Sequence, residues 1–150
     1  MTAETPDPRL RVLDPLVGEW DLHHRDLQTG DTWEGHDRFA WMDGGFFLTV
    51  EHEEFGKNIK GTMVIGFEQR WGEDAPSKQI IGHWFESSSG FHFVYFWEVD
   101  DRTVRFSFEE PDTPVRFLGQ FNDDKSQIRG EWHLPDGGGY ELTMTRVLAS

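Results

Sequence analysis

The sequence predicts an all-β fold: an antiparallel up-and-down β-barrel of about ten strands, with a short helix or turn at its N-terminal end. Two observations carry this prediction. Ten short runs rich in aromatic and β-branched residues follow one another, separated by Gly, Pro, Asp, Asn or Ser. No segment of useful length repeats its apolar residues with the 3.6-residue period of an α-helix.

The N-terminal segment is expected to be irregular over residues 1–9, which are polar and contain proline. Residues 10–17 read LRVLDPLV and favour one short helix or 3₁₀ turn. A longer regular helix is not expected, because Pro15 lacks a backbone donor and its ring clashes with the preceding turn. We expect this short segment to plug one end of the barrel.

The predicted strands then follow at short intervals. They cover residues 20–26, 33–42, 46–53, 62–69, 79–86, 91–99, 103–109, 115–121, 127–134 and 139–147. The connections, such as Gln28-Thr29-Gly30-Asp31 and Ser87-Ser88-Ser89-Gly90, consist of residues that tight turns prefer. Because short connections join antiparallel strands, the ten runs predict a meander in a single sheet.

Closure of that sheet is predicted from its two ends. Gly18-Glu19-Trp20 opens the first strand, and Arg146 lies in the last. In a closed barrel the first and last strands are neighbours, so Trp20 can lie under the Arg146 guanidinium. Such a cation–π contact stabilises a protein by roughly 0.5–2 kcal/mol.

The composition indicates one domain over residues 1–150 whose core consists largely of aromatic side chains. Hydrophobic residues make up 36% of the chain and aromatic residues 15%. The absence of cysteine excludes disulfides, thiolate metal ligands and cysteine nucleophiles.

The start MTAETPDPRLRV contains no apolar signal-like region, and no apolar run reaches the roughly 20 residues of a membrane span. We therefore expect a cytoplasmic protein.

The charge balance weighs against two classes of partner. Acidic residues number 28 and basic residues 14, so the formal net charge is −14. Nucleic acids and anionic membrane surfaces both require clustered lysine or arginine. Neither is expected as a partner of this chain.

Alternation along the strands predicts which side chains face the barrel interior. A four-residue loop at 87–90 pairs Trp84 with Phe93, and a loop at 135–139 pairs Leu134 with Tyr140 and Trp132 with Leu142. The aromatic and histidine residues expected to line a ligand pocket are Trp41, His52, Trp84, Phe93, Tyr95, Trp97, Phe106, Trp132 and Tyr140. Polar groups expected inside the barrel are His24, Asp37, His52, Glu86, Tyr95, Tyr140 and Arg146.

Catalytic candidates among these inward groups are His24, Asp37 and Glu86. A carboxylate beside His24 would orient its imidazole as general-base chemistry requires, and Asp37 is the expected partner. The other interpretation is a satisfied buried pair without catalysis. No metal site is predicted, because adjacent His23 and His24 point to opposite faces and no H-x-H or H-E-x-x-H spacing occurs. No cofactor is expected.

Four stretches carry a resemblance to a known family: LVGEW, WMDGGFFLTVEHE, GTMVIGFEQRW and QIIGHWFESSSG. They resemble a bacterial family of lipocalin-like proteins within the calycin superfamily, over roughly residues 13–147. The resemblance implies a lipocalin-like barrel and no particular reaction. The Gly-x-Trp start is also similar to that of nitrobindin-like haem barrels. Those barrels use a late histidine as iron ligand, and here the late histidine, His133, is expected outside, opposite Glu141.

Two functions remain open at this point. The first is binding of a hydrophobic or aromatic small molecule in the barrel interior. The second is an enzyme that performs acid–base isomerisation, cyclisation or hydrolysis with an inward histidine or carboxylate. A homodimer is also expected through the outer face of the 79–99 hairpin. There Ile81, Phe85, Val94 and Phe96 form an apolar patch unless a loop or the N-terminal helix covers it.

Overall fold

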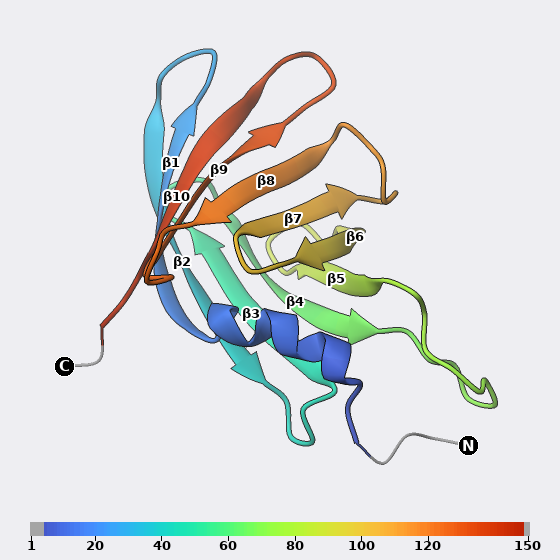
Figure 1. Ribbon diagram of the computed structural model, residues 1–150. Helices are drawn as coiled ribbons and strands as arrows, with labels where there is room; N and C mark the ends of the chain where they lie inside the picture. The colour runs from blue at the N-terminus through green and yellow to red at the C-terminus, as the bar shows by residue number, and fades with distance from the viewer. Residues whose placement is uncertain (1–4, 149–150) are drawn as a thin grey trace.

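Ten antiparallel strands close into a barrel in the computed structural model, which describes residues 5–148 (Figure 1). The elements are η1 (Pro8–Leu16), β1 (Gly18–Asp26), β2 (Thr32–Trp41), β3 (Phe47–Glu54), β4 (Ile59–Phe67), β5 (Ile80–Glu86), β6 (His92–Val99), β7 (Thr103–Phe108), β8 (Arg116–Phe121), β9 (Gln127–His133) and β10 (Gly139–Arg146). Each strand pairs with the next in sequence, and β10 pairs with β1. The predicted all-β up-and-down barrel is confirmed.

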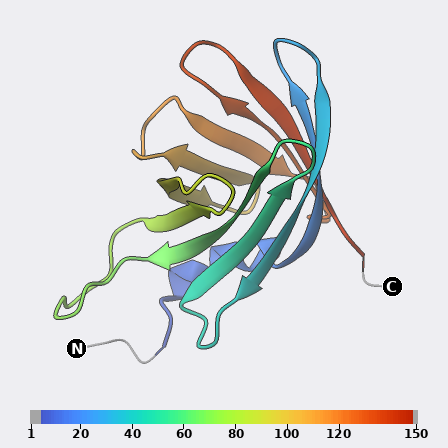
Figure 2. The same cartoon turned by 180° about the vertical axis from the view of Figure 1, so that it is seen from behind.

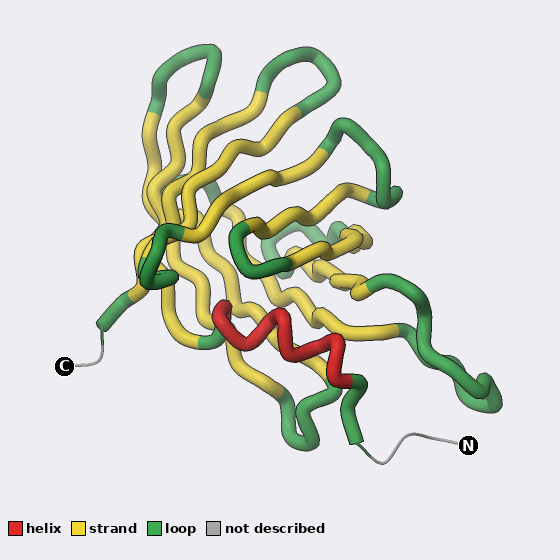
Figure 3. Tube along the Cα trace, viewed as in Figure 1, coloured by secondary structure: helices red, strands yellow, loops and turns green. Residues whose placement is uncertain are grey.

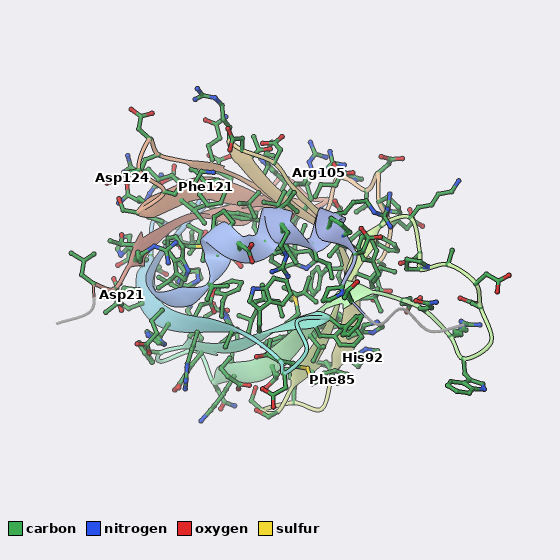
Figure 4. All side chains as sticks on the ribbon, turned by 60° about the horizontal axis from the view of Figure 1, so that its bottom comes forward. Asp21, Phe85, His92, Arg105, Phe121 and Asp124 are labelled. Atoms are coloured by element: carbon green, nitrogen blue, oxygen red, sulfur yellow. The ribbon has the colours of Figure 1, made fainter. Side chains whose placement is uncertain are left out.

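The 3₁₀ helix η1 lies across one end of this barrel (Figures 3 and 4). Leu10, Leu13 and Leu16 are buried, and their three-residue spacing matches the three residues per turn of a 3₁₀ helix. The Asp7 carboxylate accepts a hydrogen bond from the Arg9 amide at 2.9 Å and caps the helix start. Within residues 5–148, no helical segment has the length and apolarity needed to cross a membrane.

The predicted start of this helix was two residues late. Residues 8 and 9 belong to η1, because proline is favourable at the first helical position and Asp7 supplies the cap. Of the nine residues predicted to be irregular, residues 1–4 lie outside the described part of the chain.

The contact between the first and last strands closes the barrel as predicted (Figure 2). Trp20 lies opposite Arg146 in the β1–β10 register, and the guanidinium carbon is 4.3 Å from the ring centroid. Arg146 also donates to the Val17 carbonyl at 2.7 Å and to the Pro15 carbonyl. The Trp20 Nε1–H donates to the Leu16 carbonyl at 2.8 Å. Trp20 and Arg146 therefore tie η1 to the closing strand pair.

Strand register agrees with the prediction in one hairpin and differs in another. Trp84 pairs with Phe93 in β5–β6, as expected. In β9–β10, Trp132 pairs with Tyr140 and His133 with Gly139, so the predicted pairs Leu134–Tyr140 and Trp132–Leu142 were wrong.

The β9–β10 turn closes earlier than predicted because the Leu134 amide donates to the Gly138 carbonyl at 3.2 Å. A shift of two residues preserves the alternation of faces. Trp132 and Tyr140 consequently still point inward. The expected position of His133 opposite Glu141 was also wrong, since Glu141 pairs with Glu131.

The outer face of the β5–β6 hairpin is only partly exposed. Ile81 is buried and lies opposite Gly66, over which the Phe47 ring packs. Phe85 is 49% exposed and stacks on His92 at 4.8 Å between ring centroids, and both lie on the outside of the barrel (Figure 4). Helix η1 packs into the barrel end and not over this face. The homodimer stays a prediction.

Candidate functional site

A cavity of about 420 Å³ lies inside the barrel. Leu16 of η1 lines it at one end, and Glu86, Phe93 and Leu134 line it near the strand ends at the other. Predicted pocket residues that line the cavity are His52, Trp84, Phe93, Tyr95, Trp97, Phe106, Trp132 and Tyr140. The closed barrel thus surrounds a space bounded by aromatic and aliphatic side chains.

Trp41 does not line this cavity, contrary to the prediction. It is the last residue of β2, at the end of the barrel that η1 covers. Its Nε1–H donates to an Asp14 carboxylate oxygen at 3.0 Å, and the Arg11 guanidinium lies 4.6 Å from its ring. These two contacts therefore hold the Trp41 side chain against η1 and away from the cavity.

The aromatic wall is a connected set of rings. Phe106 is at its centre, stacked on Trp97 at 4.4 Å and on Phe117 at 5.0 Å between centroids. The Trp132 ring meets Phe106 edge-on at 5.4 Å, and Tyr95 meets Trp132 at 6.0 Å. Because each ring fixes the orientation of the next, this wall presents flat faces and edges at fixed positions.

The polar part of the site centres on His52. Its Nδ1 lies 2.5 Å from Asp37 Oδ1, and its Nε2 lies 2.9 Å from Glu54 Oε2. Carboxylates accept and do not donate when ionised, so both imidazole nitrogens donate and the ring is an imidazolium. The geometry therefore fixes a positive charge between two negative charges.

Burial and charge act in opposite directions on this cluster. Burial lowers the pKa of His52, but the Asp37 and Glu54 carboxylates raise it by more, to about 10. Burial raises the pKa of Glu54, whereas the His52 hydrogen bond and charge lower it, and the net effect is a lowered pKa. The Trp33 Nε1–H adds a hydrogen bond to Glu54 Oε1 at 2.7 Å.

His24 does not pair with Asp37, so the interpretation that joined these two residues was wrong; the His24 Nε2 instead lies 3.8 Å from Glu54 Oε1. The β1–β2 register places Trp33 opposite His24 and Trp20 opposite Asp37. His24 Nδ1 lies 3.2 Å from the Trp33 carbonyl oxygen, and the two rings stack at 4.9 Å. Burial lowers the pKa of His24, so this imidazole is neutral near pH 7.

Glu54 is the member of the cluster that the sequence interpretation missed. The predicted strand ended at residue 53, whereas β3 continues to Glu54. Alternation from the inward His52 places residue 54 on the same face, so one more residue of strand would have identified it. Glu54 is buried, and its two oxygens accept from Trp33 and His52.

Glu86 lies at the open end of the cavity. Ser88 donates to its Oε2 at 3.3 Å, and Ser89 donates to the same oxygen.

The two tyrosine hydroxyls of the cavity remain protonated near pH 7. Burial and the charges of Glu109, Glu86 and Glu54 raise the pKa of Tyr95 to about 12. Burial likewise raises the pKa of Tyr140 well above its ordinary value.

The remaining histidines lie on the outer face. His23 bonds Glu34 at 2.6 Å, and His83 Nδ1 is 3.4 Å from His92 Nε2. His133 lies 3.7 Å from Glu131 with 46% of its side chain exposed, so it does not reach the interior as a haem ligand would. Across residues 5–148, no group of three or more His, Asp or Glu is arranged to hold a metal ion.

We expect the His52 cluster to give the protein a defined pH dependence. A raised pKa stabilises the folded state below the ordinary histidine pKa of 6.5, and this stabilisation is lost as the pH rises through about 10. The free energy of unfolding, measured by urea denaturation, should therefore fall between pH 6.5 and 10. The decline should be smaller in His52→Gln and unchanged in His36→Gln, whose imidazole lies on the outer face near Glu19. Equal slopes in all three proteins would contradict this assignment.

Comparison with known proteins gives a likeness among solved structures. No family model matches the chain, and no curated protein matches it. Among solved structures, a redesigned β-barrel aligns with 92% of this chain and 96% of its own, at 16% sequence identity and a TM-score of 0.42.

Proposed function

We propose that the protein is a lipocalin-like binding protein that holds a hydrophobic or aromatic small molecule inside its barrel. The observation that carries this proposal is the cavity of about 420 Å³ lined by aromatic side chains. Ligand sites are typically concave spaces of roughly 300–1,000 Å³ with apolar walls and a few polar groups. The family resemblance carried by LVGEW and the later motifs supports the lipocalin-like part of the proposal.

Binding is better supported than catalysis by the arrangement of the inward groups. A general base needs a free lone pair, and both His52 nitrogens are occupied by carboxylates. His24 has no hydrogen bond to Asp37, the partner considered for it: its Nδ1 is bonded to the Trp33 carbonyl, and its Nε2 lies 3.8 Å from Glu54 Oε1. These contacts fix side chains in place, which suits a site that recognises a ligand.

Fluorescence of the cavity tryptophans tests the proposal. N-phenyl-1-naphthylamine, an uncharged aromatic probe at pH 7, should quench tryptophan emission saturably at micromolar concentration. The expected cause is contact with Trp84, Trp97 and Trp132, which all line the cavity. Absence of saturable binding by this probe would overturn the proposal.

A matched pair of variants locates the binding. Trp71 is 94% exposed in the loop between β4 and β5, so Trp71→Phe should leave the probe affinity unchanged and remove background emission. In that background, Trp97→Phe should reduce the quenching amplitude. Quenching that disappears with Trp71→Phe would place the probe on the surface and contradict an interior site.

A further inference from the structure

More negatively charged than positively charged side chains line the cavity. Three carboxylates line it, those of Asp37, Glu54 and Glu86, and the lining includes no lysine or arginine. The cation there is the His52 imidazolium, whose two N–H groups are both bonded to carboxylates. His24, which also lines the cavity, is neutral because of its burial. The interior therefore carries more negative than positive charge.

Lys57 does not change this balance inside the cavity. Lys57 belongs to the turn between β3 and β4, and its Nζ lies 4.5 Å from the Trp33 ring centroid. Lys57 is not among the residues that line the cavity. A ligand carboxylate entering the barrel would thus meet like charge without a cation to pair with.

Two carboxylate oxygens are available to a ligand. Asp37 Oδ1 accepts from His52, and within residues 5–148 no hydrogen bond to Asp37 Oδ2 is found. Only 10% of the Asp37 side chain is exposed. Glu86 uses Oε2 for Ser88 and Ser89, while its Oε1 has no donor in the described chain. An occupant with N–H donors could satisfy either oxygen.

We propose that the ligand is an aromatic amine, with its positively charged nitrogen at Asp37 or Glu86 and its ring against the aromatic wall. This inference rests on the proposed binding function and names the chemical class of the ligand. Cations are attracted to the faces of Trp and Tyr rings, and this attraction strengthens when both are removed from water. The carboxylates and the aromatic rings of the cavity therefore both favour a positively charged ligand.

Three ligands with one aromatic body and different charge test the inference. They are 2-(1-naphthyl)ethylamine, 2-(1-naphthyl)ethanol and 1-naphthylacetate, titrated into the protein by isothermal calorimetry at pH 7. The amine should bind at least about ten-fold more tightly than the alcohol, and the acid more weakly than both. Equal or tighter binding of the alcohol or the acid would overturn the amine inference and leave the binding function standing. Failure of all three would overturn the amine inference, whereas failure of the uncharged fluorescent probe would overturn the binding function on which it rests.

Variants assign the preference to the cavity carboxylates. Glu86→Gln keeps the side-chain shape, and we expect it to weaken amine binding at least about five-fold while leaving alcohol binding unchanged. Glu98→Gln is the matched control, because Glu98 is exposed on the outer face of neighbouring β6, beside Arg105. Asp37→Asn provides a second test, with thermal melting to confirm folding. An amine preference that survives both cavity variants would contradict the proposal.

Discussion

Replacing His52 with leucine should lower the free energy of unfolding by about 3–5 kcal/mol. The substitution leaves the carboxylates of Asp37 and Glu54 without the cation that lies 2.5 and 2.9 Å from their oxygens. Both acids are buried, so the loss of the cation leaves two negative charges close together without compensation. Urea denaturation at pH 7, followed by tryptophan fluorescence, measures the change.

The control for this substitution is His36→Leu on the same sheet. His36 precedes Asp37 in β2, but its side chain points outward and lies 3.5 Å from Glu19. Its removal should change stability by no more than about 0.5 kcal/mol. Adding Asp37→Asn and Glu54→Gln to His52→Leu should recover part of the loss, because the unpaired charges are then absent. A loss below about 1 kcal/mol for His52→Leu would show that the cluster is not a buried charge network.

Arg146→Ala should be the second most damaging change, with an expected loss of about 2–4 kcal/mol. The guanidinium covers Trp20 and also donates to the Val17 and Pro15 carbonyls. These carbonyls belong to the end of η1 and to the segment that follows it, so the variant should also loosen the helix from the barrel end. Thermal melting by circular dichroism measures the first effect, and hydrogen exchange of the η1 amides measures the second.

Arg129→Ala is the matched control for the closing arginine. Arg129 is exposed on β9, and its loss should change stability by no more than about 0.5 kcal/mol. Arg146→Lys keeps the charge but not the planar fork, so it should recover only part of the lost stability. Wild-type stability in Arg146→Ala would mean that the seam between β1 and β10 does not depend on this contact.

The fold was predictable because its signals are local and repeated. Alternating aromatic residues and turn sequences define each hairpin, and inward alternation places Trp20 and Arg146 on one face at the two ends of the chain. Even where the β9–β10 register was wrong by two residues, Trp132 and Tyr140 kept their inward orientation. Face assignments therefore tolerate a two-residue error in register, whereas a one-residue error would reverse them.

The contacts of the site were less predictable, because they depend on register across three strands. Asp37 and His24 share a face, but the β1–β2 register separates them, and the β2–β3 register places His52 opposite Asp37. Glu54 was missed because a strand boundary is uncertain by a residue or two. Alternation along one strand identifies which side chains face the cavity. The hydrogen-bond partners of those side chains can be identified only when the register of the neighbouring strands is known.

The meander topology has a consequence for how the chain reaches its native state. Nine of the ten strand pairings join consecutive strands, so their contacts are close in sequence. The tenth brings Arg146 to Val17, which is 129 residues away. Closing so long a loop costs more conformational entropy than forming any hairpin, and contacts of high sequence separation slow folding. Until that closure the sheet has two free edges, β1 and β10, and these edges are where partly folded chains would pair with one another.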